Sequence, residues 1–190
     1  FFYSTSWNDL GASANSVRLN FRARPGSRWQ FTVAPSWRES NNARQYIGVY
    51  PGGTAATYDA RYVFSWVKQT TLSMQLRLNY SFTPGLTLEA YAEPFASSGN
   101  FSQYGELAEA ETTTLRAYGT DNTTISQDPS GNYVVTDGTN GQTFTLPNNN
   151  FNVLSYRSNV VLRWEWRPGS ALFFIWQQNR ESDCSAGYDT

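Results

Sequence analysis

Three Pro-Gly dipeptides, each between two segments of alternating polar and apolar residues, constrain the fold of this chain more than any other feature. They stand at Pro25-Gly26, Pro84-Gly85 and Pro168-Gly169. Proline presets φ and glycine accepts φ > 0, so the pair suits a tight reversal of the chain. Proline also disrupts a paired strand. The dipeptides therefore predict a series of antiparallel hairpins, each reversing at a Pro-Gly.

The flanking segments alternate with a period of two, which is typical of strands with one apolar and one polar face. In Leu72–Phe82, every even-numbered residue is apolar and every odd-numbered residue is polar or charged. A further reversal is expected at Pro51-Gly52-Gly53, and we find no amphipathic helix of useful length. We predict an all-β fold, an antiparallel up-and-down meander of long hairpins. About nine strands are expected, over residues 1–7, 16–24, 28–38, 44–50, 59–67, 71–83, 86–95, 153–167 and 170–179.

Composition excludes several classes of protein. The 190-residue chain has a formal net charge of −1, which argues against a nucleic-acid partner. It contains no histidine and one cysteine, Cys184, so histidine-based catalysis, zinc binding and an internal disulfide lack their side chains. We therefore expect no cofactor and no metal. The sequence lacks an apolar run of about 18 residues, which excludes a transmembrane helix but not a transmembrane β-barrel.

An enzymatic role is not expected. The carboxylates of Glu89 and Glu93 share one strand face at a separation of about 13 Å, beyond the spacing of both retaining and inverting glycosidases. Glu165, on a neighbouring strand, could come closer to either carboxylate, but the chain has no nucleophile motif.

Alternation by itself leaves two folds open: a soluble β-sandwich, whose apolar faces meet in a core, and an outer-membrane-type β-barrel, whose apolar face meets lipid. Three features favour the barrel. The long strands expected in this chain match the length of a tilted membrane span. Arginine makes up 13 of the 14 basic residues, and its planar fork suits a crowded interior. Aromatic side chains mark two levels, as at membrane interfaces: Trp29, Trp37, Trp66, Tyr80, Phe82, Tyr156, Trp164 and Trp166.

The polar face of the predicted sheet carries the candidate binding residues. Arginines exceed carboxylates on this face, which favours an anionic or hydroxyl-rich solute, including a glycan. The alternative is that these charges only pair with one another. The candidates for the barrel interior are Arg18, Arg22, Arg77, Glu89, Glu93, Arg163, Glu165 and Arg167.

The connections are predicted to differ between the two ends of the sheet. In an antiparallel meander, successive connections alternate between the two ends of the sheet. This alternation places the connections 8–15, 39–43, 68–70 and 96–152 at the end opposite the Pro-Gly turns. Residues 96–152 are expected to form a long polar surface loop, in which Asp-Gly and Asn-Gly signals predict a small hairpin over Asn132–Leu146. Short turns at one end and long loops at the other are typical of outer-membrane barrels, which implies a lipid bilayer or lipopolysaccharide as partner.

Long segments of the chain resemble a bacterial family of unknown function. They are TTLSMQLRLNYSFTPGLTLEAYAEPF (Thr70–Phe95), YGELAEA (Tyr104–Ala110) and RSNVVLRWEWRPGSALFFIWQQNR (Arg157–Arg180). The resemblance implies an N-terminal carbohydrate-binding-type β-sandwich followed by a large C-terminal outer-membrane barrel, and this chain is similar to part of the barrel. The sandwich and a closing strand with a terminal aromatic residue are not found in this sequence, which favours a fragment.

Residues 1–190 are therefore expected to form a single β-barrel domain or part of one. We predict the C-terminal portion of an outer-membrane barrel at the bacterial cell surface, which binds or passes a polar solute, with carbohydrate as one solute class. A closed single-chain barrel has an even number of strands. The odd count of nine expected strands therefore predicts that further strands or neighbouring chains complete the sheet. The alternative is a β-rich structural or assembly subunit of the cell surface that is not embedded in a membrane.

Overall fold

The computed structural model describes residues 1–183, so Cys184 lies outside the described residues. The main sheet contains β1 (Phe2–Trp7), β2 (Ser13–Arg18), β3 (Phe21–Ala23), β4 (Trp29–Pro51), β5 (Ala60–Thr83), β6 (Leu86–Leu107), β7 (Leu115–Ala117), β11 (Phe151–Arg167) and β12 (Ser170–Asp183). A second sheet contains β8 (Thr123–Gln127), β9 (Tyr133–Asp137) and β10 (Gln142–Leu146). A short 3₁₀ helix, η1 (Ala55–Thr57), lies between β4 and β5.

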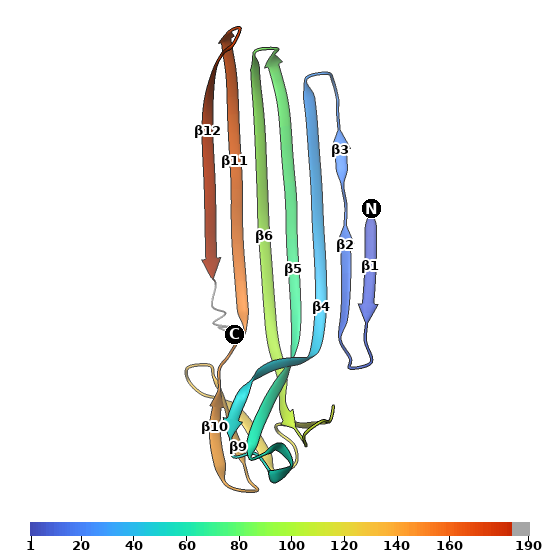
Figure 1. Ribbon diagram of the computed structural model, residues 1–190, viewed down its shortest axis with the longest axis vertical. Coiled ribbons are helices and arrows are strands. Elements are labelled where there is room, and N and C mark those ends of the chain that lie inside the picture. The colour runs from blue at the N-terminus through green and yellow to red at the C-terminus, as the bar shows by residue number, and fades with distance from the viewer. Residues whose placement is uncertain (184–190) are drawn as a thin grey trace.

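The main sheet is an antiparallel meander with the order β1-β2-β4-β5-β6-β11-β12, to which β3 and β7 add short pairings. Figure 1 shows an elongated layer with β1 and β12 at its two edges, both running away from the Pro-Gly turns. These two strands are not paired with each other, so the sheet formed by residues 1–183 is open. The predicted all-β antiparallel meander is confirmed.

The three Pro-Gly reversals lie together at one end of the sheet, as predicted (Figure 1). Neighbouring hairpins touch there, because the Glu165 amide donates to the Gly85 carbonyl oxygen at 2.7 Å. A Cβ at Gly85 would lie 2.8 Å from the Glu165 carbonyl oxygen. Glycine is therefore needed at this turn for the close approach of the adjacent hairpin.

The reversals expected at 39–43 and 68–70 are wrong, because β4 and β5 run through both positions without a break. The polar residues there pair across the two strands, Glu39 opposite Thr70 for example. Bulges in β4 bend the strand where a loop was expected. Since the reversal at 39–43 is lost, the turn that follows Pro51 lies at the end opposite the three Pro-Gly turns, and the loss of the reversal at 68–70 returns Pro84 to the first end (Figure 1).

A proline accounts for the break between β2 and β3. The Leu19 amide donates to the Pro35 carbonyl oxygen of β4 at 2.9 Å. Pro35 has no N–H to return the bond, so the ladder is interrupted at that point. The pairing with β4 resumes at Phe21.

The register places the alternating residues on two opposite faces. Residues opposite each other in antiparallel strands point to the same side of a sheet. Phe31, Leu78, Ala90 and Val160 are successive partners across β4, β5, β6 and β11, and they belong to the apolar face. Within residues 1–183 no second layer covers this face in its middle part, and Phe31 remains 41% exposed.

The buried core lies at the loop end, where β8, β9 and β10 form what we call the cap sheet. β9 and β10 are the hairpin that the Asp-Gly and Asn-Gly signals predict. The expected loop 96–152 is shorter, because β6 continues to Leu107. In Figure 1 the cap sheet lies beside the loop ends of β4 and β5, beyond the edge strands β1 and β12. The buried hydrophobic cluster there is Val63, Tyr104, Tyr118, Val135 and Leu146.

Candidate functional site

The candidate site is the polar face of the main sheet, from the Pro-Gly turns to the row of Arg38 and Thr71. One row runs Arg22, Thr32, Arg77, Tyr91 and Asn159 across β3, β4, β5, β6 and β11. The next row towards the Pro-Gly end pairs Gln30 with Asn79 and Asn79 with Glu89. The register therefore gathers Arg22, Arg77 and Glu89, three of the predicted interior residues, in adjacent rows.

A hollow opens on this face between β3, β4 and β5. It has a volume of about 320 Å³ and is lined by Arg22 and Arg77 together with amide side chains. None of its lining residues is a carboxylate. The amide residues that line it are Asn20, Gln30, Gln75 and Asn79.

Arg77 is held in place by a chain of contacts that begins on the neighbouring strand β6. Its guanidinium carbon lies 5.0 Å from the centre of the Tyr91 ring. The Tyr91 hydroxyl donates to Glu93 at 2.6 Å, and the Gln75 amide donates to the same carboxylate at 3.4 Å. Glu93 thus anchors the ring beneath Arg77 rather than neutralising the arginine. The guanidinium donors of Arg77 are left for another acceptor.

Charge is divided across the polar face. Its carboxylates are carried by β6, β11 and β12, while β2, β3, β4 and β5 contribute only arginines. The arginines of this basic half are Arg18, Arg22, Arg38 and Arg77.

The expected pairing among the interior charges is found at one place. Arg163 and Glu165 form an ion pair of 2.6 Å near the Pro-Gly end of β11, and the Gly169 amide donates to the same Glu165 carboxylate. In the described part of the chain, no other pair of the predicted interior residues forms an ion pair. Glu165 does not approach Glu89, which lies opposite Val161, four residues earlier on β11. Arg18 lies opposite Ser36 and does not line the hollow, and Arg167 lies at the Pro-Gly turn opposite Ser170.

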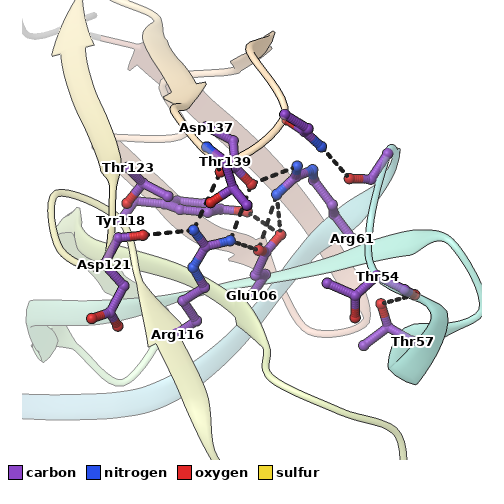
Figure 2. A network of polar contacts seen from close by, with 12 residues as sticks. Thr54, Thr57, Arg61, Glu106, Arg116, Tyr118, Asp121, Thr123, Asp137 and Thr139 are labelled. Atoms are coloured by element: carbon purple, nitrogen blue, oxygen red, sulfur yellow. Dashed lines mark hydrogen bonds and ion pairs between the residues drawn. The ribbon is translucent and has the colours of Figure 1, made fainter.

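A second polar cluster, which sequence reasoning missed, is buried under the cap sheet (Figure 2). Arg61 of β5 donates to Glu106 at 2.9 and 3.0 Å and to Asp137 at 2.8 Å. Arg116 of β7 donates to the same two carboxylates at 3.1 and 3.0 Å. The Tyr118 hydroxyl adds a bond to Glu106 at 3.1 Å. We call Arg61, Glu106, Arg116 and Asp137 the buried ion network.

Burial and charge act together in this network. The side chains of Arg61 and Asp137 are 2% and 4% exposed. The guanidinium groups of Arg116 and Arg61 hold the pKa of Asp137 well below its usual range. Burial, reinforced by the Glu106 charge, raises the pKa of Tyr118. The network carries two positive and two negative charges and fastens the cap sheet to β5, β6 and β7.

A family described as "Domain of unknown function (DUF5916)" matches residues 2–188. The chain belongs to this family. No curated protein and no solved structure matches the chain.

In this DUF5916 chain, most of the predicted interface aromatics lie on the apolar face near its two limits. Trp29 packs on Tyr80 with ring centres 4.1 Å apart, and Tyr80 contacts Phe82 at 4.5 Å. Trp164 and Trp166 lie 6.3 Å apart at the same end. Trp37 and Tyr156 lie towards the loop end. Trp66 lies farther along β5, beyond Lys68, where it approaches Gly11.

Two other features are absent from the described residues: a cluster of metal-ligating side chains and a membrane-spanning helix. Within residues 1–183, no group of three or more cysteine or acidic side chains is placed to hold a metal ion. No helix in this range is long and apolar enough to cross a membrane.

Proposed function

We propose that the chain is a portion of an outer-membrane β-barrel whose polar face lines an interior that binds or passes a polar solute. The observation that carries the proposal is the sharp limit of the apolar face at the loop end. Trp37, Leu72, Ala96 and Leu154 form one row of partners across four strands. The next row on the same face is Glu39, Thr70, Ser98 and Asn152.

This limit supports a membrane because the change of polarity falls in one row on β4, β5, β6 and β11. A soluble sheet has no reason to change polarity along a straight line across four strands. An ion pair of 3.2 Å between Lys68 and Glu39 lies on the same face just beyond the limit. Charged side chains are expected where a barrel leaves the hydrocarbon.

The height of the apolar face fits the same proposal. Leu72 to Phe82 covers ten steps of β5, or about 33 Å at about 3.3 Å per residue. A tilt of about 40° reduces this to roughly 25 Å, the apolar height of outer-membrane barrels. Leu72 and Leu154 are 54% and 46% exposed in the described structure, as lipid-facing residues would be.

The two ends of the sheet support an orientation. In such a barrel the three Pro-Gly turns would face the periplasm and the cap sheet would lie outside the cell. Val63, in the core under the cap sheet, and Arg77 are both odd-numbered residues of the continuous strand β5. Their side chains therefore lie on the same face of the main sheet. The cap sheet would therefore lie over the outer mouth of the interior. The open edges at β1 and β12 would be completed by further strands.

Cysteine labelling of the full-length protein in outer-membrane vesicles tests the proposal. In a Cys184→Ser background, we compare Leu78→Cys with Asn79→Cys and Val160→Cys with Asn159→Cys. A fluorophore at Leu78 or Val160 should be quenched by lipid-attached nitroxides, and the neighbouring positions should instead react with a water-soluble maleimide. Equal reaction of both members of each pair with the maleimide would overturn the proposal and favour a surface subunit outside the membrane.

A further inference from the structure

We propose that the hollow between Arg22 and Arg77 binds the carboxylate of an acidic sugar. The inference rests on the proposed function, since it names the class of polar solute that the interior would take. It starts from the absence of ion pairs: within residues 1–183, neither Arg22 nor Arg77 forms one, although Glu89 lies in the row next to Arg77. The hollow that both arginines line contains no carboxylate.

Two exposed arginines on one small hollow offer a site for an anion. Their like charges repel, and each guanidinium presents donors in a planar fork that matches a carboxylate. Arg61, which is buried under the cap sheet, is paired with two carboxylates, whereas Arg22 and Arg77 are exposed and unpaired in the described structure. On the polar face the nearby Glu93 bonds to Tyr91 and Gln75 instead.

Arg77 is also preorganised for binding. The Tyr91 ring lies against its guanidinium at 5.0 Å, and the ring is anchored through its hydroxyl. A fixed guanidinium loses less side-chain freedom when it binds a ligand. This arrangement favours a specific anion site over a diffuse positive field.

The remaining lining indicates a hydroxyl-rich ligand. The Arg24 guanidinium donates to the Gln30 side-chain oxygen at 2.9 Å, which leaves the Gln30 NH₂ group as a donor. The Gln75 NH₂ group donates to Glu93, which leaves its oxygen as an acceptor. Asn20 and Asn79 supply further donors and acceptors on the same hollow. Hydroxyl groups, which both donate and accept, match such a lining.

The size of the hollow limits the ligand to a small unit. Its volume of about 320 Å³ lies at the lower end of the range of roughly 300–1,000 Å³ for ligand pockets. One acidic sugar residue, free or at the end of a chain, fits this size better than a long segment of glycan.

Calorimetric titration of the full-length protein in detergent with D-glucuronate and D-glucose tests the inference, because the two sugars differ only in the carboxylate. We expect glucuronate to bind about tenfold to 100-fold more tightly than glucose, as charged hydrogen bonds imply. Arg77→Gln and Arg22→Gln should each remove this preference. Arg38→Gln is the matched control, because Arg38 lies on the same face opposite Thr71 and outside the hollow, and it should keep the preference.

Several results would overturn the inference. They are no binding of glucuronate, equal binding of the two sugars, an equal loss in Arg38→Gln and Arg77→Gln, or equally tight binding of inorganic phosphate. Thermal unfolding of each variant separates a folding defect from lost binding. If Arg77→Gln does not fold, Arg22→Gln alone tests the inference. If Leu78 and Asn79 label as lipid-facing and water-facing but glucuronate does not bind, the barrel proposal survives and this inference fails.

Discussion

Replacing Asp137 by asparagine should release the cap sheet from the main sheet. The substitution keeps the shape of the side chain but removes its charge, so the buried ion network changes from neutral to a net charge of +1. The Asp137 carboxylate accepts bonds of 2.8 Å from Arg61 and 3.0 Å from Arg116. It also accepts one of 3.0 Å from the Thr139 amide. Two guanidinium groups would then share the single carboxylate of Glu106.

The expected cost follows from the burial of this site. Arg61 and Glu106 have side chains only 2% and 7% exposed, so water cannot replace the lost charge. Breaking a buried ion pair in this way costs about 3–5 kcal/mol. Since each 1.4 kcal/mol is a factor of ten, opening of the cap sheet should become about 100-fold to several thousandfold more frequent.

Hydrogen exchange measured by mass spectrometry gives the assay. Peptides from 123–146 should exchange faster in Asp137→Asn by the factor above, while peptides from the Pro-Gly end of β5 should not change. Asp121→Asn is the matched control, because Arg116 bonds to the Asp121 backbone oxygen and not to its side chain. Equal protection of 123–146 in Asp137→Asn and Asp121→Asn would show that the network does not hold the cap sheet.

Three further predictions concern the same structure. Leu78→Arg should destabilise the membrane-inserted protein by about 2–4 kcal/mol, whereas Asn79→Arg should have little effect, and urea unfolding in lipid vesicles would measure the difference. The folded-state pKa of Asp137 is lowered, so its contribution to stability is complete above the ordinary aspartate pKa of about 3.9 and is lost only as the pH falls towards the folded-state pKa. Hydrogen-exchange protection of 123–146, corrected for the intrinsic exchange rate, should therefore be equal at pH 7 and pH 5. Gly105→Ala should loosen β7, since a Cβ there would lie 2.6 Å from the Arg116 carbonyl oxygen, and protease cleavage near Arg116 should become faster than in wild type.

Part of the candidate site could be predicted from the sequence. Alternation with a period of two assigns Arg22 and Arg77 to the polar face, because strand geometry sends successive side chains to opposite sides. It does not say which residues of different strands become neighbours. That Arg22 and Arg77 flank Thr32 in one row depends on the register of β3, β4 and β5, which is set by long-range pairing. The pair of Arg163 and Glu165, two residues apart on one face, is local and could be anticipated.

The sequence by itself determined the all-β class, the two faces and the three Pro-Gly reversals, because backbone preference and alternation are local properties. Only the tertiary structure decided that β4 and β5 continue through 39–43 and 68–70, since pairing between the strands stabilises polar residues that would otherwise suit a loop. It also decided the buried ion network. Its four charges come from segments between Arg61 and Asp137, and nothing in their local patterns marks them as partners. They meet because charges buried under the cap sheet must be paired.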